Sequence, residues 1–184
     1  MIDTHCHLTF PDFAGRLDEV MEEARLAGVT GAITISTSSQ DVESALRVAQ
    51  SHERVWCSAG VHPLYADKGP HDWAKIRRVA EHPKCVAIGE LGLDNHYDHP
   101  PAALQREVLA DQLAHIELWK RDGLELPIVL HCRKAFDDLI PILRATTLDR
   151  SRFVFHCFTG DPGDARKALD FGAMISFTGV VTYK

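Results

Sequence analysis

The sequence predicts an α/β fold of parallel strands and, among such folds, a TIM-type (β/α)8 barrel. Short β-branched runs alternate with segments whose apolar residues recur at helical spacing, a pattern typical of parallel strands joined by crossover helices. The glycine fingerprint of dinucleotide-binding sheets is absent after the first strand, where His5-Cys6-His7 stands instead, and this favours the barrel. Polar residues end several of the strands, where barrel enzymes carry their active site.

Seven strands can be placed by their apolar, β-branched composition. They are expected near residues 2–8, 32–37, 55–61, 86–93, 128–132, 153–158 and 174–180. Between them, apolar residues at i, i+3, i+4 and i+7 predict helices that include residues 17–24, 42–49 and 136–143. Pro141 falls inside the last of these, so that helix either kinks or restarts there.

Composition and charge exclude several classes of protein. Of 184 residues, 45% are hydrophobic and 25% are charged, as in an ordinary globular protein. No apolar run is long enough to cross a membrane and no signal peptide begins the chain, so we expect a cytoplasmic location. A net charge of -6 excludes a broad basic surface for long duplexes, so any nucleic-acid contact must be local. Nothing in the sequence points to an obligate protein partner.

The cysteines predict no disulfide framework and no thiolate zinc cluster, because there are five of them and no C-x-x-C pair. Cys6, Cys132 and Cys157 each directly follow a metal-binding candidate. Strand alternation therefore predicts that their thiols point away from the site and pack as small core residues, and Cys57 and Cys85 are expected to be structural as well.

Histidines and one glutamate predict a metal centre. His5 and His7 project from the same face of the first strand, because side chains alternate along a strand. Residues with metal-binding side chains also end four further strands: His62, Glu90, His131 and His156. Each could instead be a separately hydrogen-bonded polar residue, but such residues on five parallel strands favour one shared metal site.

These segments resemble successive signatures of TatD-related deoxyribonucleases, barrel enzymes of the amidohydrolase-like group. The resemblance runs from one end of the chain to the other. The matching segments are Ile2-Asp3-Thr4-His5-Cys6-His7-Leu8, Gly60-Val61-His62-Pro63, Ile88-Gly89-Glu90-Leu91-Gly92-Leu93-Asp94, Leu130-His131-Cys132-Arg133, His156-Cys157-Phe158-Thr159-Gly160 and Ile175-Ser176-Phe177-Thr178-Gly179. Gln105 and Gln112-Leu113 also resemble the family's helix before the fifth strand.

The resemblance implies two divalent metal ions, which could be Mg²⁺, Mn²⁺ or Zn²⁺. His5 and His7 would hold one ion, His131 and His156 the other, and Glu90 would bridge them. Glu90 and His62 would be the catalytic residues, with His62 contacting the substrate phosphate or an outer-shell water.

The substrate implied by the resemblance is the end of a DNA strand, single-stranded in the first instance, with RNA as a second candidate. Arg133 either points off the barrel interior or turns at the strand end to bind a phosphate. Tyr65 and Tyr97 fall in loops after the third and fourth strands, where ordinary packing and stacking on an unpaired base are both physically reasonable.

The length of the chain predicts an incomplete barrel. TIM-type barrels typically need about 250 residues and eight strands, whereas this chain ends at Lys184 after the seventh. We therefore expect residues 1–184 to be a single metal-dependent hydrolase domain truncated after strand 7, with its C-terminal strand and helix missing. The family's eighth-strand metal-binding aspartate would be missing with them.

Three functions remain open from the sequence. The first is a metal-dependent deoxyribonuclease of exonuclease type that cleaves phosphodiester bonds with a metal-activated water. The second is hydrolysis of a small phosphoester, lactone or amide by the same chemistry, because metal-bound hydroxide attacks carbonyl carbon as well as phosphorus. The third is an inactive metal-binding fragment whose barrel does not close.

Overall fold

The computed structural model describes residues 1–183 and contains a seven-stranded parallel sheet with the strand order β1-β2-β3-β4-β5-β6-β7. Its strands are β1 (Ile2–Cys6), β2 (Gly31–Thr34), β3 (Val55–Ala59), β4 (Cys85–Asp94), β5 (Ile128–Arg133), β6 (Phe153–Phe155) and β7 (Met174–Ile175). Each strand pairs with its neighbours in chain order, as in a TIM-like barrel. The predicted α/β fold with TIM-like parallel strands is therefore confirmed.

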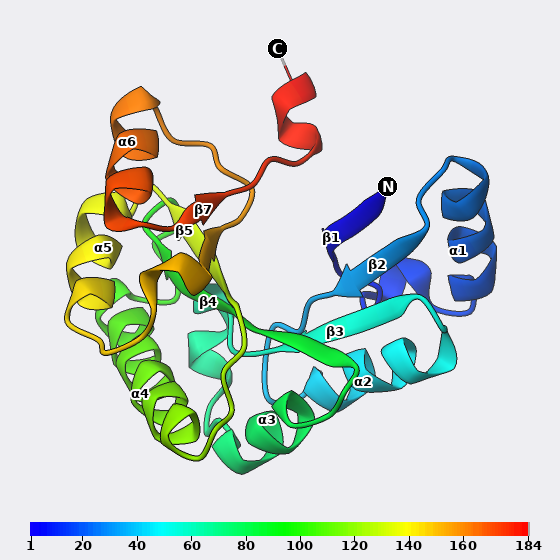
Figure 1. Cartoon of the computed structure of the whole chain (residues 1–184), viewed down its shortest axis with the longest axis horizontal. Coiled ribbons are helices and arrows are strands. Elements are labelled where there is room, and N and C mark those ends of the chain that lie inside the picture. Colours follow the sequence, from blue (N-terminus) through cyan, green and yellow to red (C-terminus); the bar gives the residue numbers. More distant parts are fainter. Residues whose placement is uncertain (184) are drawn as a thin grey trace.

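Helices cover the outer face of the curved sheet (Figure 1). They are α1 (Leu17–Leu26), α2 (Val42–Ser51), α3 (Trp73–Ala80), α4 (Ala102–Arg121), α5 (Phe136–Arg144) and α6 (Pro162–Phe171). Fully buried side chains such as Leu139, Leu143 and Phe171 join the helices to the strands that carry Leu130 and Phe155. Helices on the outside leave the inner face and the strand ends available for a site.

The sheet bends so far that its edge strands, β1 in blue and β7 in orange-red, face each other (Figure 1). Within residues 1–183, β1 pairs only with β2 and β7 only with β6. The bend also brings the first and sixth strands close at their carboxyl ends, since the rings of His5 and His156 stack with centroids 3.4 Å apart.

The last strand is shorter than the sequence predicts. Residues 174–180 were expected to be extended, but β7 stops at Ile175, and Gly179–Thr182 forms a short 3-10 helix. The prediction is wrong for residues 176–180, because a β-branched run gives the same signal whether or not a neighbouring strand pairs with it. Pro141 lies within α5 without splitting it in two.

No helix in the described part of the chain combines the length and the hydrophobicity that a membrane-spanning helix requires.

Candidate metal centre

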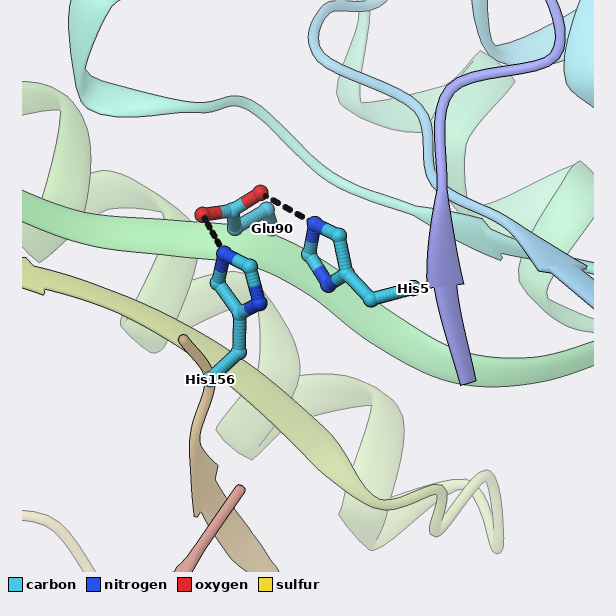
Figure 2. A group of neighbouring side chains, drawn as sticks. All are labelled: His5, Glu90 and His156. Carbon is cyan, nitrogen blue, oxygen red and sulfur yellow. Dashed lines mark ion pairs between the residues drawn. The ribbon is translucent and has the colours of Figure 1, made fainter. Parts of the chain in front are cut away.

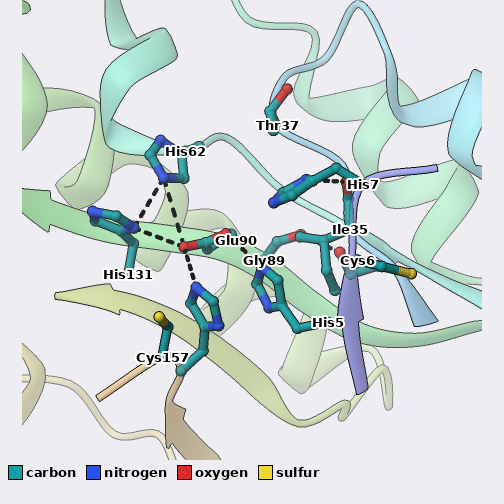
Figure 3. Close-up of polar contacts among 12 residues, drawn as sticks. His5, Cys6, His7, Ile35, Thr37, His62, Gly89, Glu90, His131 and Cys157 are labelled. Atoms are coloured by element: carbon teal, nitrogen blue, oxygen red, sulfur yellow. Dashed lines mark hydrogen bonds and ion pairs between the residues drawn. The ribbon is translucent and has the colours of Figure 1, made fainter. Parts of the chain in front are cut away.

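The carboxylate of Glu90 is the hub of the site. It is 1% exposed and lies in the middle of β4. Imidazole nitrogens surround it: His131 Nδ1 lies 2.8 Å from Oε1, His5 Nε2 lies 3.0 Å from Oε2, and His156 Nε2 and His62 Nε2 lie 3.3 and 3.6 Å from Oε1 (Figure 3). Five predicted site residues thus meet in one small volume.

These side chains come from five strands and converge because the strands are parallel. His5 lies in β1 and His131 in β5, while His156 directly follows β6. His62 follows β3 and begins the 3-10 helix Pro63–Lys68, with its Nδ1 accepting a hydrogen bond from the Leu64 amide. Parallel strands place their carboxyl ends at one edge of the sheet, so residues far apart in sequence become neighbours.

Two groups within this cluster are suited to a divalent cation. His5, Glu90 and His156 form one (Figure 2), and His62, Glu90 and His131 form the other; within each group the ligand atoms lie within 4.8 Å of one another. In the described chain, the buried Nδ1 atoms of His5 and His156 have no hydrogen-bond partner. Imidazole nitrogens and a carboxylate lie close together here, and some of the nitrogens lack hydrogen-bond partners. A divalent cation that bound these atoms would supply the missing interactions.

His7 is a member of neither group. Its Nδ1 donates to the carbonyl oxygen of Ile35 at 3.2 Å (Figure 3). Its ring stacks on Phe10. A carbonyl at one ring nitrogen leaves the other available, which is a common arrangement for a metal-binding histidine. The geometry groups His5 with His156 and His62 with His131, whereas the resemblance paired His5 with His7 and His131 with His156; the assignment of ligands to ions stays a prediction.

Asp94 is a member of the site that was not predicted from the sequence. It is 1% exposed, and its Oδ2 lies 2.8 Å from His131 Nε2 while its Oδ1 accepts from the amides of His96 and Tyr97. His131 is therefore held between two buried carboxylates, Glu90 at Nδ1 and Asp94 at Nε2. The spacing between Glu90 and Asp94 could have revealed this role, because residues four apart on a strand face the same way.

These contacts shift the pKa values of the buried groups. Burial alone would raise the pKa of Glu90, but hydrogen bonds from His131, His156 and His5 hold it well below its ordinary value. Burial opposes charge on His131, yet Asp94 and Glu90 raise its pKa to about 9. Burial lowers the pKa of His62 to about 3, and it also lowers that of His5. Glu90 is thus ionised, His131 is cationic and His62 is neutral at pH 7.

A tight backbone contact fixes the bend of β4 that presents Glu90. Gly89 has φ +135°, and its carbonyl oxygen accepts a 2.6 Å hydrogen bond from the buried Ser58 hydroxyl. Gly60 lies against this bend, where an added Cβ would come within 2.6 Å of the Gly89 Cα. No side chain fits at residue 60 unless the bend moves.

Arg133 lies beside the cluster and has no ion pair with Glu90. Its guanidinium covers the ring of Tyr97, with Cζ 5.3 Å from the centroid. It also lines a cavity of about 350 Å³ together with His131, His156 and Thr159. The strand therefore does turn Arg133 toward the side of the molecule that carries the cluster.

The predicted direction of Cys157 is wrong. It has φ +47° and follows the last residue of β6 by two positions, so strand alternation no longer applies to it. Its thiol lies 2.9 Å from the Thr178 hydroxyl, and the residue lines the same cavity as His131 and His156. Cys132 is buried, but it also lines that cavity, whereas Cys6 donates to the Ile33 carbonyl.

Comparisons with known proteins point to one family of enzymes. Residues 2–184 match the family model described as TatD related DNase. The metal-dependent hydrolase YabD of Bacillus subtilis is 34% identical over 185 residues, which cover all of this chain and 71% of that protein. A protein of Erwinia tasmaniensis named 3'-5' ssDNA/RNA exonuclease TatD is 36% identical over 181 residues, which cover 97% of this chain and 68% of that protein.

A solved structure gives the same result. The crystal structure of YJJV, a TatD homologue from Escherichia coli K12, superposes with a TM-score of 0.87 at 31% identity, covering all of this chain and 70% of that one. The family match over nearly the whole sequence and the shared fold lead to the same conclusion. The chain belongs to the TatD related DNase family of metal-dependent hydrolases.

Proposed function

We propose that the protein hydrolyses phosphodiester bonds at the ends of single-stranded DNA, and of RNA as a second substrate, with two divalent metal ions. The observation that carries the proposal is the buried Glu90 carboxylate with four imidazoles within 3.6 Å of its oxygens. Support for the substrate comes from the Erwinia relative, which is named a 3'-5' ssDNA/RNA exonuclease.

In this proposal His5, His7 and Glu90 hold one ion, and Glu90, His131 and His156 hold the other. Mixed imidazole and carboxylate ligands accept Mg²⁺, Mn²⁺ or Zn²⁺. When bound, such a pair of ions would activate a water and stabilise the attacking and leaving oxygens of a displacement at phosphorus.

His62 and Arg133 would orient the substrate phosphate. The Leu64 amide donates to His62 Nδ1, so the neutral ring carries its proton on Nε2, the nitrogen that faces Glu90 and His131. A neutral N–H donor suits a phosphate oxygen and does not repel a bound cation. Arg133 would add a fixed positive charge at the mouth of the cavity.

The charge balance and the proposed location are consistent with this substrate. A single-stranded end that enters a local pocket needs no long basic groove, so a net charge of -6 is no obstacle. We place the activity in the cytoplasm.

The test is nucleotide release from a single-stranded oligonucleotide with Mg²⁺, Mn²⁺ or Zn²⁺, compared with the same protein in EDTA. His156→Ala should abolish the activity, because it removes a side chain from the cluster. His99→Ala is the matched control, since the side chain of that histidine is 72% exposed and, within residues 1–183, pairs only with Asp67. Equal rates for wild type and His156→Ala would mean that another nuclease does the cutting.

The same assay separates the alternatives. Hydrolysis of a small phosphoester, lactone or amide without nucleotide release would favour the second function. Metal binding without hydrolysis of any of these substrates would favour an inactive metal-binding fragment.

A further inference from the structure

We infer that the loop after β4 and the end of β5 form a nucleotide subsite beside the metal cluster. In it Tyr97 stacks on an unpaired base while Arg133 and Lys134 bind the neighbouring phosphates. The inference rests on the proposed function, because it names the part of a single-stranded substrate that this region takes.

The ring of Tyr97 is presented for stacking. It is 50% exposed, although the guanidinium of Arg133 lies 5.3 Å from its centroid and Nη1 donates to its hydroxyl at 3.4 Å. Proteins bind single-stranded nucleic acids by stacking bases on aromatic rings and by pairing phosphates with positive charges. An aromatic ring next to a guanidinium offers both contacts.

Two adjoining cavities supply the path. The cavity of about 350 Å³ that includes His131 and His156 shares Arg133 and Thr159 with a second cavity of about 320 Å³. The second cavity is lined by His96 and Lys134 as well. A strand whose scissile phosphate lies at the cluster would therefore pass Arg133 and enter the second cavity.

The loop that carries Tyr97 is held in place. Asp94 Oδ1 accepts from the Tyr97 amide at 3.3 Å, the Asn95 amide donates to the Arg133 carbonyl at 2.9 Å, and the Asn95 side chain donates to the Lys134 carbonyl at 3.2 Å. A fixed ring loses little entropy on binding a base.

Two cations at the second cavity, Arg133 and Lys134, are available to bind phosphate. Within residues 1–183, neither Arg133 nor Lys134 has an ion pair. Two acidic residues line the same cavity: Asp161 accepts from the Asp164 amide at 2.9 Å, and Asp164 pairs with Lys167 at 3.1 Å. Asp161 keeps its charge, because a hydrogen bond from an amide does not neutralise a carboxylate. Among the described residues that line this cavity, two cations without ion pairs therefore stand against one carboxylate without one.

The test is a thermodynamic cycle in which the Tyr97 ring and one base of the substrate are removed separately and together. Binding of fluorescein-labelled oligodeoxythymidylates to the protein in EDTA is measured by anisotropy, with one abasic residue placed at each of the first positions from the end. We expect wild type to lose about tenfold in affinity when one particular base is missing. Tyr97→Ala should lose the same tenfold on the intact strand and nothing further on that abasic strand, whereas Tyr97→Phe should behave as wild type.

Activity and salt dependence give independent readouts. Tyr97→Ala should raise the KM for the oligonucleotide by a larger factor than the KM for methyl p-nitrophenyl phosphate, which has no base but still meets Arg133. Lys134→Gln should reduce the salt dependence of oligonucleotide binding by about 0.7 in the slope of log K against log salt.

Two results would overturn the inference: undiminished abasic sensitivity in Tyr97→Ala, or equal slowing of both substrates by that variant. Failure of wild type to hydrolyse either phosphodiester would instead overturn the proposed function. The binding measurement still decides the subsite in that case.

Discussion

Glu90 is a charged residue in a place where an isolated charge would cost several kcal/mol. It is 1% exposed, and its partner in the metal-free protein is His131, 2.8 Å away. Asp94 contacts the other nitrogen of the same ring at 2.8 Å. One imidazolium therefore compensates two buried carboxylates, and a metal ion that binds at Glu90 and His131 must displace a proton from that ring.

The first prediction concerns the protonation of these histidines. With burial opposing its charge but Asp94 and Glu90 favouring it, His131 has a pKa of about 9, so NMR of the metal-free protein should show it charged at pH 7.5 while His62 stays neutral at pH 5. A histidine whose pKa is higher in the folded protein than in the unfolded chain contributes its full stabilisation below the unfolded pKa of about 6.5. The His131 contribution to the free energy of unfolding should therefore fall as pH rises from about 6.5 to about 9. Titration of His131 near 6.5 would refute the assignment.

The second prediction concerns Asp94. Asp94→Asn keeps the size of the side chain but removes the carboxylate that orients His131. We expect metal affinity to fall about 10- to 100-fold, as it does when other carboxylates behind metal-binding histidines are removed. Competition with a chelating dye measures it, and Asp98→Asn, in the exposed loop beyond, is the control. An unchanged dissociation constant would mean that Asp94 serves the loop alone.

At the scale of the elements, the sequence predicted what periodicity encodes. Alternation of strands and helices located all seven strands, and polar residues at strand ends located the residues that meet at Glu90. It failed where the backbone leaves regular geometry, as at Cys157 with φ +47°. It also failed at residues 176–180, where strand-like composition does not show whether a pairing partner is present.

The third prediction concerns the bend of β4. Gly60→Ala places a Cβ about 2.6 Å from the Gly89 Cα, so the bend that presents Glu90 must shift. Urea unfolding should show a loss of about 1 to 3 kcal/mol, with weaker metal binding. Gly179→Ala is the matched control, since nothing lies within 4 Å of its added Cβ. Equal stability of the two variants would show that the contact is not tight.

At the scale of the whole molecule, the site joins the first strand of the sheet to the sixth. His5 comes from β1 and His156 follows β6, yet both reach Glu90 in β4. The curvature of the sheet is therefore part of the site, because a flat sheet would keep these strands far apart. A metal ion bound there would tie the first strand to the sixth and stabilise the fold by an amount that grows with the logarithm of its concentration over its dissociation constant.

The most direct test of this account is the position of bound metal in crystals grown with Mn²⁺ or Zn²⁺. Anomalous scattering should give peaks adjacent to the Glu90 carboxylate, bounded by imidazole nitrogens of His5, His131 and His156, and these peaks should vanish in Glu90→Gln. Peaks confined to surface residues, or none at Glu90 in a crystal saturated with metal, would contradict the claim that these strands build a metal centre.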